Sequence, residues 1–163
     1  MSKAVKLRKG LNINLLGEVE KVKVDAQLPS LVALKPSDFH GTVPKVIVKE
    51  GEKVKRGEVV FYDKYHKDIK WVSPVSGTLT EIVRGEKRKI LEIRISVEGM
   101  DDAVSIDPVD PASISREEVK KIMLENGLWP FIKQRPIDVV ADPNVTPKAI
   151  FISAFDTSPL APD

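Results

Sequence analysis

A short unit that occurs twice between residues 41 and 87 constrains the fold more than any other feature of the chain. In the first copy, Gly41-Thr42-Val43 is followed, ten residues after its glycine, by Gly51-Glu52-Lys53. In the second copy, Gly77-Thr78-Leu79 is followed, eight residues after its glycine, by Gly85-Glu86-Lys87. Because repeated units of this kind bury their apolar faces against each other, the repeat predicts two half-motifs that share one hydrophobic core.

Four segments in this part of the chain have the composition of β-strands. Each is β-branched or alternates apolar with polar residues, and glycine-bearing turns separate them. They are residues 46–48, 59–62, 78–83 and 90–95. We therefore predict a small, mainly β domain over residues 37–100, with residues 1–36 packing on this domain or completing it.

Two longer strings narrow the fold class. Residues 48–61 have the form V-x-x-G-[DE]-x-V-x-x-G-x-x-[LV], and residues 73–79 have the form S-P-x-x-G-x-[VL]. In biotinyl and lipoyl domains, such strings mark strands joined by tight turns, where glycine takes the positive φ that reverses the chain. Since both strings occur in the same order here, the sequence predicts a barrel-sandwich hybrid (biotinyl/lipoyl-like) domain. Its structural turn glycines are Gly51, Gly57, Gly77 and Gly85.

Carrier domains of this type hold a biotinylated or lipoylated lysine at the hairpin tip between the two strings. Here that tip is residues 62–71, where counting forward from the first string points to Lys67 and counting back from the second points to His66. Asp63-Lys64 is the nearest equivalent of the lipoyl Asp-Lys-Ala string, but it lies too early. We therefore expect solvated lysines without a covalent group. An adduct on Lys64 or Lys67 is the alternative.

Residues after 100 change in composition and predict a helix. Residues 101–114 are rich in aspartate and contain prolines, as a linker would. Ser115 is the predicted N-cap of the helix, with Glu118 as its capping-box partner three residues on. Gly127 stands where the C-terminal cap is expected.

The rest of the chain predicts the beginning of a second, α/β domain over residues 115–163. The aromatic residues of 129–132 are expected to anchor a core, and residues 136–148 form a proline-punctuated loop. Residues 149–155 have the composition of a strand buried in a parallel sheet. We interpret this as the first strand of a truncated, Rossmann-like domain, so that the chain is mainly β with an α/β tail and is expected to continue beyond Asp163.

Composition narrows the classes of function. The chain has 26 basic and 24 acidic residues, a net charge of +2, which does not favour a nucleic-acid-binding protein. Without cysteine it can form no disulfide, thiolate zinc site or cysteine-ligated iron–sulfur cluster of its own. No apolar run approaches the roughly 20 residues that a membrane-spanning helix needs.

The sequence offers no recognisable catalytic or metal site. His40 and His66 lie 26 residues apart, without paired carboxylates around them. None of the common nucleophile, zinc-protease or phosphate-binding strings occurs, and no G-x-G-x-x-G follows the apolar segment 149–159. We therefore nominate no catalytic and no metal-binding residue, and the cofactor-binding residues stay unassigned.

Strings distributed over nearly the whole chain resemble the N-terminal part of one family, the A subunit of the sodium-translocating NADH:quinone oxidoreductase. They are Lys6-Leu7-Arg8-Lys9-Gly10-Leu11-Asn12-Ile13, residues 48–61, Pro74-Val75-Ser76-Gly77-Thr78, Arg84-Gly85-Glu86-Lys87-Arg88, Gly127-Leu128-Trp129 with Arg135-Pro136, and residues 151–161. The fourth string and the last are more specific than the shared glycine turns.

This resemblance implies a peripheral subunit on the cytoplasmic face of the bacterial inner membrane, bound to the other subunits of a complex that couples NADH oxidation and quinone reduction to sodium export. It also implies that NAD, FAD, FMN and iron–sulfur clusters belong to partner subunits, that the full-length subunit is a candidate for quinone binding, and that this fragment binds no cofactor and is inactive alone. The alternatives are a subunit of the related Rnf electron-transport complex and a biotinyl/lipoyl-type carrier or adaptor module.

Overall fold

The computed structural model describes residues 16–17, 20, 22–110 and 112–153 of the chain. Residues 27–146 form one compact unit, which holds all the strands and helices named below. Residues 1–26 with 147–163 are grouped as a second unit. The predicted family string at residues 6–13, and residues 154–163 of the last one, lie outside the described residues.

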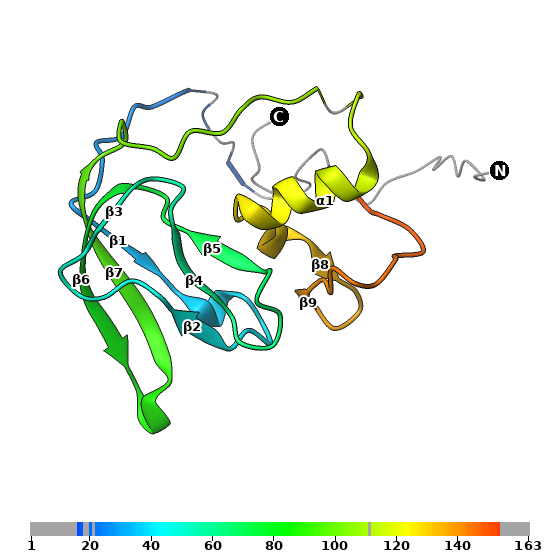
Figure 1. Cartoon of the computed structure of the whole chain (residues 1–163). Coiled ribbons are helices and arrows are strands. Elements are labelled where there is room, and N and C mark those ends of the chain that lie inside the picture. The colour runs from blue at the N-terminus through cyan, green and yellow to red at the C-terminus, as the bar shows by residue number, and fades with distance from the viewer. Residues whose placement is uncertain (1–15, 18–19, 21, 111, 154–163) are drawn as a thin grey trace. The chain divides into compact units, whose positions relative to one another are not determined.

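Two antiparallel sheets form the β domain (Figure 1). The larger has the strand order β1-β7-β6-β3 and the smaller the order β2-β4-β5. The strands are β1 (Leu31–Leu34), β2 (Pro44–Val46), β3 (Lys53–Val54), β4 (Val59–Asp63), β5 (Lys70–Val72), β6 (Ser76–Arg84) and β7 (Ile90–Gly99), with two short 3-10 turns, η1 (Pro36–Asp38) and η2 (Glu86–Arg88). This arrangement confirms the predicted mainly β, barrel-sandwich class. Strand β1 pairs with β7 at the edge of the larger sheet.

The core lies between the sheets because apolar residues of both alternate toward it. Leu79, Ile93 and Ile95 of the larger sheet are fully buried. From the smaller sheet, the ring of Phe61 stacks on that of Trp71 with centroids 4.8 Å apart. Burying each such side chain stabilises the fold by about 1.5–3 kcal/mol.

The four glycines predicted at turns have different roles. Gly51 and Gly57 have φ of +87° and +85°, the left-handed values that a reversal requires. Gly77 corrects the prediction of a turn, because it lies inside β6, where a side-chain carbon would overlap the Ser96 carbonyl oxygen. Gly85 is a second correction: its φ is −99°, since the tip of the β6–β7 hairpin reverses further along the chain, at Lys87.

The helix forms where its capping signals predict it. Helix α1 spans Arg116–Glu125, and Ser115 is its N-cap. The Ser115 side chain accepts a hydrogen bond from the Glu118 backbone N–H, and the Glu118 carboxylate accepts one from the Ser115 backbone N–H at 2.7 Å. Gly127 follows the helix with a φ of +70°, as expected for a C-terminal glycine.

The segment after the helix is more structured than predicted. It contains the 3-10 turn η3 (Trp129–Phe131) and a small hairpin of β8 (Lys133–Gln134) and β9 (Val139–Val140), the second strand lying in the predicted loop. Trp129 packs against the core, as expected, and its indole N–H donates to the Ala141 carbonyl oxygen at 2.7 Å.

The strand predicted at residues 149–155 is not formed in the described part of that segment. Residues 149–153 have no regular structure, and Ile150, Phe151 and Ile152 are 76%, 93% and 85% exposed. A strand needs a neighbouring strand to accept its backbone hydrogen bonds. No strand in the described residues pairs with this segment, so its apolar composition alone does not form one.

Candidate functional site

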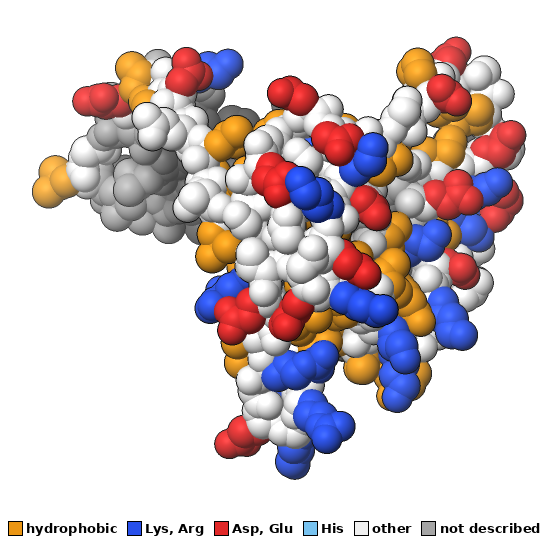
Figure 2. Space-filling view, turned by 60° about the vertical axis from the view of Figure 1, so that its left-hand side comes forward, with side chains coloured by type: hydrophobic (Ala, Val, Ile, Leu, Met, Phe, Trp, Pro, Cys, Tyr) orange, Lys and Arg blue, Asp and Glu red, His pale blue; other side chains and the backbone are white. Residues whose placement is uncertain are grey.

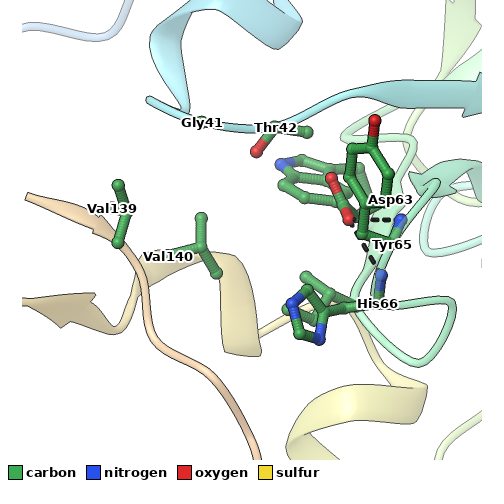
Figure 3. A pocket seen from close by; sticks show the side chains of 9 residues that line it. Gly41, Thr42, Asp63, Tyr65, His66, Val139 and Val140 are labelled. Carbon is green, nitrogen blue, oxygen red and sulfur yellow. Dashed lines mark hydrogen bonds between the residues drawn. The ribbon is translucent and has the colours of Figure 1, made fainter.

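The tip of the β4–β5 hairpin, residues 64–69, occupies the position at which carrier domains hold their lysine. Asp63 precedes it, and only 5% of this residue is exposed. One carboxylate oxygen accepts hydrogen bonds from the backbone N–H groups of Tyr65 at 2.8 Å and His66 at 2.9 Å (Figure 3). The other accepts from the backbone N–H of Val43 at 2.9 Å. Asp63 therefore holds the tip in one conformation and ties it to the segment before β2.

The sequence motifs did not reveal the role of Asp63, since Asp63-Lys64 resembles only a misplaced carrier motif. The available signal was local: an aspartate that follows a strand commonly accepts hydrogen bonds from the backbone N–H groups two and three residues on. The bond to Val43 carries no such signal, because it joins residues 20 positions apart.

A pocket of about 350 Å³ lies beside this tip. Its lining comes from the segment before β2, the end of β4, the tip, β5 and β9. Figure 3 labels lining residues from all of these except β5. The lining residues are Gly41, Thr42, Asp63, Tyr65, His66, Ile69, Trp71, Val139 and Val140. Most of this wall is apolar, so the pocket suits a small, uncharged ring system more than a charged ligand.

Trp71, one of the residues that line the pocket, has its indole N–H buried in the protein. Trp71 is 4% exposed, and its Nε1 is buried without a hydrogen-bond partner among the described residues. Leaving a buried donor unsatisfied costs about 1–3 kcal/mol. The indole ring lies between two phenylalanine rings. Phe61 stacks on it, and Phe39 packs edge-on against it with the two ring centroids 5.3 Å apart.

The candidate residues from the sequence come together only in part. His66 lies in the pocket wall with its Nδ1 4.0 Å from the Asp142 carboxylate, whereas His40 is exposed and lines no part of it. In the part of the chain that the structure describes, no group of three or more His, Asp or Glu side chains could hold a metal ion. The residues that line the pocket around His66 also lack a nucleophile paired with a base, so the pocket supports binding more than covalent chemistry.

The two lysines of the tip do not resemble a carrier site. Lys64 and Lys67 are exposed, and the Lys64 ammonium lies 5.7 Å from the centroid of the Tyr65 ring. A swinging arm needs a tip that stands free of the rest of the chain. Here one side of the tip faces the pocket that Val139 and Val140 of β9 also line.

Among the helices of the described residues, none is long and apolar enough to cross a membrane.

Comparison with known proteins adds two family matches. The model described as the NqrA N-terminal barrel-sandwich hybrid domain matches residues 5–98, and the model described as the NqrA second alpha/beta domain matches residues 114–163.

Curated relatives agree with these matches, and each is the A subunit of a Na(+)-translocating NADH-quinone reductase. The chain is 38% identical over 162 residues to the relative from Neisseria meningitidis serogroup A, covering 98% of this chain. It is 38% identical over 160 residues to the relative from Photorhabdus laumondii and 37% identical over 158 residues to that from a Marinomonas species, each covering 96% of this chain. The chain spans 36% of the length of each of these relatives.

Proposed function

We infer the function from one premise: the chain belongs to the family of the A subunit of the Na(+)-translocating NADH-quinone reductase. We propose that it forms the N-terminal part of such a subunit, in a complex that couples NADH oxidation and quinone reduction to sodium export. The observation that carries this proposal is the family match over residues 5–98 together with 98% coverage of this chain by the Neisseria relative.

Within that complex the chain acts as a docking and scaffolding part without a redox centre of its own. The sequence supports this role because the chain has no cysteine to ligate an iron–sulfur cluster. NAD, the flavins and the iron–sulfur clusters then belong to partner subunits, and the chain is inactive alone. The subunit lies on the cytoplasmic face of the bacterial inner membrane, bound to the membrane-embedded subunits.

A quinone ring is the ligand that we assign to the pocket beside Trp71 in the full-length subunit. A quinone is a flat, uncharged ring with two carbonyl acceptors. The pocket has apolar walls from Ile69, Val139 and Val140, and the Trp71 side chain is one of its lining residues. These properties support contact between the pocket and a quinone ring in the full-length subunit.

The proposed role is tested by reassembly. The full-length subunit is added to detergent-solubilised complex from a strain that lacks it, and the bound protein is measured after gel filtration. We expect saturable binding in a fixed ratio to the other subunits. Elution of the protein by itself under all conditions, or a deletion strain with undiminished NADH-driven sodium export, would contradict the proposal.

A further inference from the structure

Beyond its pairs with β1 and β3, the β6–β7 hairpin continues as a two-stranded ribbon whose base is anchored by the buried side chain of Ile90. The last β1 pair toward the tip joins Leu34 to Ile93, and the last β3 pair joins Lys53 to Thr78. Beyond these pairs, residues 83–92 are hydrogen-bonded only to each other within the sheet. Figure 1 shows the ribbon, in green, extending past the other strands.

The tip of this ribbon is strongly basic. It carries four cationic side chains and one acidic one, all exposed, in six consecutive residues. The cations are Arg84, Lys87, Arg88 and Lys89, and the acid is Glu86. None of the four forms an ion pair with another described residue, in contrast to Lys53 and Lys55, which pair with Glu98 and Asp102. In Figure 2, Lys and Arg side chains gather at the lower end of the molecule, where Figure 1 places this hairpin.

The turn at the tip has a backbone that its residues do not favour. Lys87 and Arg88 have φ of +53° and +61°, and the Lys89 N–H donates to the Glu86 carbonyl oxygen at 3.1 Å. Two left-handed central residues closed by this hydrogen bond make a type I′ turn, for which Asn-Gly is the preferred pair. A lysine and an arginine are disfavoured there because the β-carbon of an L-residue crowds the backbone in this conformation.

Local stability therefore does not explain the composition of the tip. Like charges gathered at an unfavourable turn weaken the tip of the ribbon. Residues held in disfavoured backbone conformations are concentrated at sites of function. The combination points to a surface that is selected for what it binds.

We propose that the ribbon tip, Arg84–Lys89, is a docking finger that inserts into an acidic, concave surface on another protein subunit of the complex. This inference rests on the proposed function, because it assumes such a complex. The shape and charge of the finger indicate what its partner looks like. The partner has a hollow lined by aspartate and glutamate side chains, whose negative charge complements the four cations of the finger. Glu86 then lies at the rim of this hollow, away from the acidic side chains.

A protein partner fits the observations better than a membrane surface. Anionic lipid headgroups are fluid and attract any flexible run of cations, so they require neither a hydrogen-bonded ribbon nor a tight turn. Here the ladder continues to the pair Arg84 and Ile90, and the turn fixes the directions of its two central side chains. Glu86 at the tip would also oppose an anionic membrane, whereas a structured partner can accommodate it.

The test replaces the central pair by the pair that the turn prefers. The double variant Lys87→Asn with Arg88→Gly removes two charges and improves the turn, so loss of folding does not confound it. The control, Lys45→Gln with Lys49→Gln, removes two exposed charges elsewhere on the domain. Both are made in the full-length subunit. Their affinities for solubilised complex from the deletion strain are measured in about 50 mM and about 300 mM NaCl.

We expect the tip variant to bind at least about ten-fold more weakly than the parent at the lower salt concentration. Raising the salt concentration should then reduce the affinity of the tip variant by a smaller factor than it reduces that of the parent. The control should bind within about two-fold of the parent. A tip variant that binds as tightly as the parent overturns the docking finger but leaves the proposed function intact. Failure of the parent protein itself to bind contradicts the proposed function instead.

A second arm separates the protein partner from a membrane. The same proteins are sedimented with vesicles of which about one-third is phosphatidylglycerol and the rest phosphatidylcholine. The proposal expects no difference between the parent and the tip variant. Vesicle binding that depends on the tip, together with unchanged binding of the tip variant to the complex, assigns the finger to the lipid and overturns the proposal.

Discussion

The Asp63 carboxylate accepts a hydrogen bond from the backbone N–H of Val43 at 2.9 Å, and so joins the end of β4 to the segment before β2 across 20 positions of sequence. The same carboxylate orders the hairpin tip through Tyr65 and His66. One buried side chain thus fixes both the carrier-type tip and one wall of the pocket.

Replacing Asp63 by alanine should destabilise the domain. The change leaves three backbone N–H groups without their acceptor. Each unsatisfied buried N–H group costs about 1–3 kcal/mol of stability, and water that reaches the hairpin tip reduces this cost by accepting some of these hydrogen bonds. We expect Asp63→Ala to lower the free energy of unfolding by about 2–4 kcal/mol in urea titrations. Asp68→Ala, an exposed aspartate of the same tip, should change it by less than about 0.5 kcal/mol. Equal effects of the two substitutions would show that the Asp63 carboxylate does not hold the hairpin tip and the segment before β2 together.

The contact of Gly127 with β5 predicts a second effect. A β-carbon on Gly127 would lie 2.7 Å from Cγ1 of Val72, and the residue has a φ of +70°. Gly127→Ala therefore combines backbone strain with a clash, whereas Gly51→Ala, with φ of +87° and open space around it, adds only strain of about 1–2 kcal/mol.

We expect Gly127→Ala to be the more destabilising of the two, and Val72→Ala to relieve part of its effect in the double variant. The measurement is the coupling free energy from a double-mutant cycle in urea. Independent effects of the two substitutions would contradict close packing of the helix end against β5.

The capping box of α1 predicts a dependence of stability on pH. The hydroxyl and backbone N–H of Ser115 hold the pKa of Glu118 below its ordinary value of 4.5. Because the folded pKa is the lower one, this interaction stabilises the fold fully above pH 4.5, and the contribution is lost as the pH falls through the folded pKa.

Ser115→Ala should lower the free energy of unfolding by about 1 kcal/mol at neutral pH, and the difference from the parent should shrink below pH 4.5. Ser105→Ala, an exposed serine of the linker, is the matched control and should show neither effect. A difference for Ser115→Ala that stays constant down to acid pH would refute the interaction with ionised Glu118.

Quinone binding at the pocket predicts a fluorescence change specific to one tryptophan. The chain has two tryptophans, so Trp129→Phe leaves Trp71 as the single reporter and Trp71→Phe leaves Trp129. Titration with a short-chain ubiquinone should quench the first variant saturably, and a redox-inert analogue should reproduce the quenching. Equal, unsaturable quenching of both variants would show that the pocket does not bind the quinone.

The parts of the structure that follow local rules are those that the sequence predicted. Ser115 and Glu118 cap α1 because a capping box depends on residues three apart, and Gly51 and Gly57 reverse the chain because only glycine enters that conformation readily. The barrel-sandwich class followed from two glycine strings in a fixed order. These signals need no knowledge of distant neighbours.

The remaining features depend on contacts between distant residues. Gly77 is needed because Ser96 approaches it from the neighbouring strand, which no turn rule detects. Segment 149–153 has the composition of a buried strand but no partner strand among the described residues, and the pocket exists only because β9 folds back beside the tip.

The most direct test of the proposed function is sodium transport by membrane vesicles from a strain that lacks its own copy of this subunit. Vesicles from cells that express the full-length form of the present protein are given NADH, and sodium-22 uptake is followed with and without a protonophore. We predict that the protein restores NADH-driven uptake that the protonophore does not abolish. Uptake equally strong without the protein, or absent although the protein is bound to the complex, would contradict the proposed function.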